Sequence, residues 1–185
     1  MTIKDIVAVA LFAAFIAVLG FLPPIPIPVI PVPITAQLLG IILAGAVLGA
    51  KRGFAACILF LILVAAGLPL LSGGRGGISV FMSPTTGYLI GFPLTAALIG
   101  YLYYVFRNRL TPITEILVMM IGVFGVDHLI GVVWLANMGG LDWSKALLGD
   151  LIFVPGDMVK IVIAYLVVRR LRKALPDLMN DGFSK

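Results

Sequence analysis

Charged side chains are scarce in this 185-residue chain. Asp, Glu, Lys and Arg make up 11% of it, against about 25% in soluble domains. Hydrophobic residues make up 62%, and the mean hydropathy is +1.19. So few polar side chains cannot cover a water-soluble globule of this size, which excludes a cytosolic enzyme domain, a disordered tail and a fibrous protein. The net charge of +5 does not indicate a nucleic-acid partner, because the basic residues flank apolar segments.

Cysteine and histidine occur once each, as Cys57 and His128. One cysteine excludes a disulfide framework within the chain, and one of each residue cannot form a metal-ligand set of the usual spacing. The glycine-rich stretch 73–77 is not followed by Gly-Lys-Ser/Thr, so it is no Walker-type phosphate loop. We therefore expect no metal, no cofactor and no nucleotide site. We also expect no cleaved signal peptide, because the first apolar segment is long enough to span a membrane.

Long apolar runs are what the sequence has instead. A helix needs roughly 20 mostly apolar residues to cross a bilayer, and lipid-facing segments without strand-like alternation favour helices over a barrel. We predict one domain over residues 1–185, an all-α integral membrane protein built as a six-transmembrane-helix bundle. The predicted spans are about 6–22, 35–50, 53–68, 84–106, 112–136 and 145–168.

The basic residues predict the orientation of these spans. With the N-terminus in the cytoplasm, two basic residues lie outside (Arg75 and Lys145) and Lys160 lies within a span. The other ten are then cytoplasmic: Lys4, Lys51, Arg52, Arg107, Arg109, Arg169, Arg170, Arg172, Lys173 and Lys185. This bias follows the positive-inside rule and predicts that both termini are cytoplasmic.

Two outer loops have unusual compositions. Residues 23–33 contain six prolines among Ile and Val, so this segment cannot be helical and is too apolar for a solvated linker. We predict that it is a semi-rigid flap over the outer mouth of a cavity. Residues 69–83 hold a glycine-rich stretch that includes Gly74. Such a loop is either a flexible connector or a backbone that approaches a ligand closely.

Polar side chains within the spans gather in the outer half of the predicted membrane. Asp157 and Lys160 lie one helical turn apart on one face, after Pro155, and Gln37 lies in the outer part of its span. A charge inside the bilayer is costly, so the pair needs a reason. It is either part of a ligand site or an internal ion pair that fixes packing.

Asp127 and His128 are a second polar pair. Adjacent helical residues point about 100° apart, so we expect that both cannot face one cavity squarely. They either bridge neighbouring helices or relay protons. Glu115 lies near the cytoplasmic end of its span, and we expect it to be solvated.

Small residues form faces suited to close helix contact. Ala10, Ala13, Ala14 and Ala17 follow helical spacing on the first span. Gly87 and Gly91 form a similar step on the fourth. Such faces serve packing within the bundle or docking of a partner membrane protein.

Several motifs together resemble one family. They are the Gly-Gly-x-Gly-Gly loop, the run from Pro84 to Phe92, the step from Gly131 to Leu135, and Pro155-Gly156-Asp157-x-x-Lys160. With the six-span layout, they resemble the BioY family, the biotin-specific substrate-binding (S) components of energy-coupling factor (ECF) vitamin transporters. The resemblance covers nearly the whole chain.

This resemblance implies a multi-pass protein of the bacterial plasma membrane that binds biotin from outside and is not an enzyme. It implies a transmembrane T component and two cytosolic ATPases as partners. The alanine face would dock on the T component through Ala10 and Ala14, with Ala13 and Ala17 adjoining. The ligand residues that it implies are Asp157, Lys160 and Gln37.

The chemistry of biotin suits these side chains. Its ureido ring carries two N–H donors and one carbonyl acceptor, and its tail ends in a carboxylate. A carboxylate at Asp157 accepts from an N–H, and Lys160 donates to the ureido oxygen or to the tail. Arg75 is expected to meet the tail carboxylate, and Gly74 lies beside it in the loop. Tyr88 and Trp134 are expected to pack on the bicyclic ring.

Two other functions stay open at this point. The chain is alternatively an S component for another small vitamin, or a stand-alone secondary transporter coupled to protons through Asp127 and His128. An intramembrane enzyme with His128 as base is the least favoured reading, because no Ser or Cys is placed as its nucleophile.

Overall fold

The computed structural model describes residues 1–138 and 140–174, and its regular elements over these ranges are all helical. Lys185, expected on the cytoplasmic side, lies outside the described residues. The helices are α1 (Ile3–Leu19), α2 (Gln37–Ala65), α3 (Thr86–Val105), α4 (Pro112–Gly122), α5 (Leu129–Asn137), α6 (Trp143–Leu151) and α7 (Phe153–Ala174), with short 3-10 helices η1 (Ile78–Met82) and η2 (Arg107–Arg109) and a π-helical segment η3 (Val123–His128). The helices confirm the all-α class over these ranges.

The N-terminus of α1 is held by a capping box. The Thr2 hydroxyl accepts from the backbone N–H of Asp5, and the Asp5 carboxylate accepts from the backbone N–H of Thr2. Asp5 also pairs with Arg52 at 3.0 Å, which ties the start of α1 to α2. These hydrogen bonds, with that of the Thr2 backbone foremost, hold the pKa of Asp5 below its usual value.

The second and third predicted spans are the two limbs of α2. The helix is interrupted at Gly49, whose φ of 79° is accessible mainly to glycine. The two limbs fold back on each other. This places Gln37, at the start of α2, close enough to donate to the carbonyl of Leu70, just beyond the end of α2. The chain therefore reverses next to Lys51 and Arg52, where the sequence places a basic turn.

The fourth and fifth predicted spans have nearly the expected bounds. The fourth is α3, and the fifth runs without a gap through α4, η3 and α5. The prediction of regular helix over 112–136 missed the π-helical segment in its middle.

The prediction of a single helix for the sixth span is wrong. Residues 145–168 divide at Ile152 between α6 and α7, and the bend between these two helices is 41°. Pro155 has no N–H to donate to the carbonyl of Leu151, four residues earlier, and α6 ends at Leu151. By length and composition, α2, α3 and 112–137 are each able to cross a membrane, and the bent pair makes a fourth if it is one span. The number of six crossings stays a prediction.

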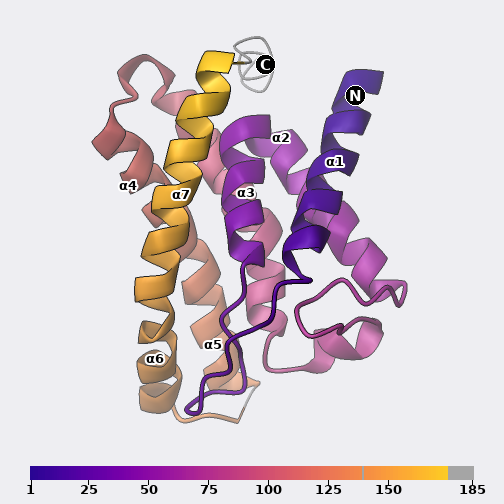
Figure 1. Cartoon of the computed structure of the whole chain (residues 1–185). Helices are drawn as coiled ribbons and strands as arrows, with labels where there is room; N and C mark the ends of the chain where they lie inside the picture. The colour runs from indigo at the N-terminus through magenta and orange to yellow at the C-terminus, as the bar shows by residue number, and fades with distance from the viewer. Residues whose placement is uncertain (139, 175–185) are drawn as a thin grey trace.

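The two ends of the bundle differ in character. Figure 1 shows the start of α1 and the end of α7 at one end of the molecule, and the connection from α1 to α2 at the other. That connection contains the proline-rich flap, residues 23–33. Its ends are joined by backbone hydrogen bonds between Ile25 and Ile34. Ile27, Ile30 and Val32 are buried, so apolar side chains seat the flap on the helices.

Glu115 corrects one expectation. It is 2% exposed, not solvated. Its carboxylate accepts from the Arg172 guanidinium at 3.0 and 3.4 Å and from the Tyr103 hydroxyl at 3.1 Å. These contacts join α3, α4 and α7 beside the cytoplasmic end that the sequence predicts. Arg172, 57 residues away in the chain, compensates the carboxylate charge and so offsets the free-energy cost of burying it.

Candidate ligand site

The flap covers a hollow between the helices. Its walls come from the flap and the residues after it, the start of α2, the loop 69–83, the start of α3, η3 and α7. Five of the predicted ligand residues line it: Gln37, Arg75, Tyr88, Asp157 and Lys160. The hollow has about 560 Å³ of empty space, counting the part open to solvent.

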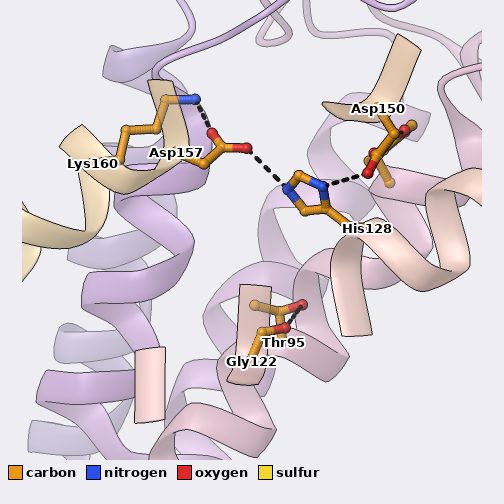
Figure 2. A network of polar contacts seen from close by, with 7 residues as sticks. Thr95, Gly122, His128, Asp150, Asp157 and Lys160 are labelled. Atoms are coloured by element: carbon orange, nitrogen blue, oxygen red, sulfur yellow. Dashed lines mark hydrogen bonds and ion pairs between the residues drawn. The ribbon is translucent and has the colours of Figure 1, made fainter. Parts of the chain in front are cut away.

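A chain of ionic hydrogen bonds crosses one wall of this hollow, as Figure 2 shows. The Lys160 amine donates to Asp157 Oδ1 at 2.6 Å. Asp157 Oδ2 lies 2.9 Å from His128 Nε2, and His128 Nδ1 lies 2.8 Å from Asp150 Oδ2. An imidazolium, with a proton on each nitrogen, donates to both carboxylates. Two cations then balance two anions, which makes the burial of these charges tolerable.

Asp150 is the residue of this hydrogen-bonded network that the sequence did not lead us to predict. It lies on α6 and is 8% exposed. Its second oxygen accepts from the Tyr88 hydroxyl at 2.8 Å. Asp150 precedes Asp157 by seven residues, a spacing that places two residues on the same face of a regular helix. This spacing could have predicted that the two carboxylates lie on the same side.

The π-helical segment carries the second polar pair, Asp127 and His128. Both residues border the hollow, but Asp127 Oδ1 is enclosed against Gly91 of α3, so the expectation that the two do not both face one cavity squarely stays a prediction. The wider turn of a π-helix changes the directions of its side chains. Thr95 on α3 donates to the carbonyl of Gly122, the residue before this segment, at 3.4 Å (Figure 2). The irregular turn is thereby tied to its neighbour.

Close helix contact sets the positions of these side chains. A Cβ at Gly87 would lie 2.4 Å from Trp134 Cβ, and one at Gly91 would lie 2.4 Å from Asp127 Oδ1. The glycine step of α3 therefore packs against η3 and α5, as its spacing predicts.

Comparison with known proteins identifies the family. A model of the BioY family matches residues 1–177. The chain belongs to the BioY family. A relative from Rhizobium etli, named biotin transporter BioY, is 46% identical over 95% of this chain and 97% of its own length. A probable biotin transporter BioY from Bacillus subtilis is 40% identical over 98% of this chain and 96% of its own length.

A solved structure agrees with this family membership. It is the S component for biotin from an ECF-type ABC transporter, with a TM-score of 0.88 and 39% identity, covering 94% of this chain and 95% of that chain. A second S component of a bacterial ECF transporter has a TM-score of 0.56 at 15% identity, which shows a shared fold alone. A fold common to S components and several long apolar helices make this BioY-family chain a multi-pass membrane protein.

Gln37 lines the hollow of this BioY-family chain, but its amide also holds the backbone around it. Its nitrogen donates to the carbonyls of Ile16 and Leu70 at 3.3 and 3.1 Å, and its oxygen accepts from the Ser72 N–H at 3.2 Å. These contacts fix the loop 69–83 to α1 and α2.

Three other predicted ligand residues have different positions. Arg75 lines the hollow, and its Nε donates to the Ser72 carbonyl at 3.4 Å. Gly74, with φ of 70°, turns the same loop and is not among the lining residues. Trp134 is not among them either, and its indole N–H donates to the Ser83 carbonyl at 3.1 Å. Trp134 therefore holds the residues just before α3 from a position outside the lining of the hollow.

The alanine face of α1 is divided between two environments. Ala13 and Ala17 are buried against the bundle, whereas Ala10 and Ala14 are exposed. Of these four alanines, only Ala10 and Ala14 are therefore accessible to a partner.

Proposed function

We propose that this chain captures biotin from the outer side of the bacterial plasma membrane and carries it across as the S component of an ECF transporter. One observation carries the proposal. An amine and a carboxylate, Lys160 and Asp157, lie 2.6 Å apart in a hollow that is roofed by an apolar flap, in a chain of the BioY family. Relatives and a solved neighbour are biotin transporters and a biotin S component by name.

The polar groups of the hollow complement those of biotin. Asp157 accepts from a ureido N–H, and Lys160 donates to the ureido carbonyl or to the carboxylate of the tail. Tyr88 presents its ring, and Arg75 meets the tail carboxylate. The apolar residues of the flap and of α3 cover the thioether ring. A site built this way rejects analogues that leave its buried polar groups unpaired.

The chain lies in the membrane as a six-crossing bundle with both termini in the cytoplasm. The two limbs of α2 count as two crossings, and the bent pair α6–α7 counts as one. The common position of the start of α1 and the end of α7 in Figure 1 supports this arrangement. The Glu115–Arg172 pair then lies at the cytoplasmic end, and the flap lies outside.

Its partners are a transmembrane T component, which docks on the face of α1 that exposes Ala10 and Ala14, and two cytosolic ATPases that supply the energy. The chain itself binds and carries, without a cofactor and without making or breaking a covalent bond.

Titration calorimetry of the purified chain in detergent tests the proposal, with biotin, desthiobiotin and a chemically unrelated vitamin. We expect tight, sodium-independent binding of biotin and a large loss of affinity in Asp157→Asn. Preference for the other vitamin overturns the assignment of biotin. Uptake driven by a pH gradient into proteoliposomes that hold this chain alone favours a proton-coupled transporter instead.

A further inference from the structure

We propose that the hydroxyl of Thr35 hydrogen-bonds the ligand and accepts the ureido N–H that Asp157 does not take. This inference rests on the proposed function and names a further residue that determines its specificity. It starts from the short segment between the flap and α2, where the family resemblance implies that Gln37 is the ligand residue.

The amide of Gln37 has no N–H left for a ligand. Its nitrogen carries two N–H groups and donates to two backbone carbonyls, those of Ile16 and Leu70. Its oxygen accepts from the Ser72 N–H, and the residue is 2% exposed. Gln37 therefore holds the backbone around it, so a donor or acceptor that this segment offers to a ligand has to come from another residue.

Thr35 is the residue of this segment with an unengaged hydroxyl. It lines the hollow two residues before Gln37 and is partly buried. Within residues 1–138 and 140–174, its hydroxyl makes no hydrogen bond, and its oxygen is not enclosed. A hydroxyl that borders a hollow without a protein partner is available to a molecule that enters it, both as a donor and as an acceptor.

The accepting role follows from the other polar groups of the hollow. Lys160 and Arg75 carry N–H groups alone and cannot accept, so they suit the carbonyl and the carboxylate of biotin. His128 uses both ring nitrogens on Asp150 and Asp157. The hydroxyl oxygen of Thr35 adds an acceptor that these side chains do not provide.

The shape of a cyclic urea requires acceptors on two sides. Its two N–H bonds diverge on either side of the carbonyl. Asp157 lines the hollow from α7, and Thr35 lines it from the segment that leads into α2. Thr35 also follows Ile34, whose backbone is hydrogen-bonded to Ile25 at the other end of the flap. A ligand bound to Thr35 is therefore held beside the base of the flap.

Two substitutions of Thr35 isolate its hydroxyl. Thr35→Val replaces the hydroxyl by a methyl group in a side chain of the same shape, and Thr35→Ser keeps it. We expect Thr35→Val to bind biotin about tenfold more weakly than the unmodified chain, and Thr35→Ser to bind within about threefold of it. Calorimetric titration in detergent measures the affinities. Unchanged affinity in Thr35→Val overturns the inference, and so does a loss in Thr35→Ser as large as that in Thr35→Val.

Thr85 provides a matched control, because it also lines the hollow but its hydroxyl is engaged. This hydroxyl lies 2.7 Å from that of Ser83, which itself donates to the Val80 carbonyl at 2.6 Å. Thr85→Val therefore removes a hydroxyl from the same hollow without removing a free one.

Analogues of biotin identify the group that the Thr35 hydroxyl meets. In each of two cyclic carbamates, one ureido N–H is replaced by an oxygen atom. We expect the unmodified chain to bind both more weakly than biotin, and the ratio for one of them to fall close to one in Thr35→Val but not in Thr85→Val. Ratios that Thr35→Val leaves unchanged overturn the inference. If the loss in Thr35→Val disappears with biotin methyl ester, the hydroxyl meets the tail carboxylate, which also overturns it.

A stability measurement separates ligand recognition from a structural role. The Thr35 hydroxyl has no partner to lose, so we expect Thr35→Val to keep the ligand-free Tm, whereas Gln37→Met lowers it. An equal fall in both variants indicates a structural role for Thr35 and overturns the inference. Thr35→Ala takes the place of Thr35→Val if the latter does not fold. Absence of biotin binding by the unmodified chain overturns the proposed function, whereas biotin binding that ignores the Thr35 hydroxyl overturns this inference alone.

Discussion

Nε2 of His128 lies 2.9 Å from Oδ2 of Asp157, although 29 residues separate the two in the chain. The contact joins η3 to α7 and fixes the rotamer of the carboxylate that we assign to the ligand. His128 therefore acts on the ligand through Asp157 as a positioning residue, and Asp150 in turn orients His128.

We expect His128→Ala to weaken biotin binding about tenfold or more, since a hydrogen bond between charged groups is worth about 1.5–3 kcal/mol. The same variant lowers the Tm, because Asp150 and Asp157 lose their shared donor. Calorimetry and thermal unfolding in detergent measure the two effects.

A double-mutant cycle tests whether His128 works through Asp157. If it does, His128→Ala combined with Asp157→Asn weakens binding by much less than the sum of the two single effects. Fully additive losses show that the two residues act independently and contradict the positioning role.

The Asp157–Lys160 pair was predictable because it depends on local spacing alone. Residues one helical turn apart share a face whatever surrounds them, and polar side chains in an apolar span are conspicuous. The flap was predictable for a similar reason, since its prolines exclude helix and its Ile and Val need a surface to cover.

Asp150 and Glu115 were not predictable in this way, because tertiary contacts decide their environments. Asp150 joins the network through Tyr88 on α3 and His128 on η3. Glu115 is buried because of Arg172, 57 residues later. The π-helical turn has no spacing signal of its own, so it could not be predicted from the sequence.

The Glu115–Arg172 pair predicts a separation of stability from binding. We expect Arg172→Met to lower the free energy of unfolding by about 1–3 kcal/mol, since it leaves a buried carboxylate with a partner removed. Biotin affinity is expected to stay unchanged, because the hollow lies elsewhere. Arg170→Met removes the same charge from an exposed position two residues away and is the matched control. Equal Tm values for the two variants contradict the role of the pair.

Gly91 and Gly125 form a second matched pair. A Cβ at Gly91 meets Asp127 Oδ1 at 2.4 Å and the Asp127 backbone at 3.0 Å, whereas one at Gly125 has its nearest neighbour at 4.0 Å. We expect Gly91→Ala to displace η3 and weaken biotin binding at least tenfold, since overpacking costs about 1–3 kcal/mol. Gly125→Ala is expected to bind as the unmodified chain does. Calorimetric titration compares them, and equal affinities contradict the close contact of α3 and η3.

The contact between Gly149 and the flap predicts an effect on the rate of release. Ile30 is 3% exposed, and a Cβ at Gly149 on α6 would lie 2.2 Å from its Cγ2. The methyl group added in Gly149→Ala must therefore displace Ile30, and with it the flap, even though alanine is more favourable than glycine in a helix by roughly 0.5–1 kcal/mol. If the flap retains the ligand, biotin dissociates about tenfold faster from this variant, with overpacking again costing about 1–3 kcal/mol. Gly156→Ala, whose Cβ meets Ile34 at an ordinary 3.7 Å, is expected to keep the rate. Chase of labelled biotin measures both rates, and an unchanged rate in Gly149→Ala shows that the ligand leaves by a route that the flap does not cover.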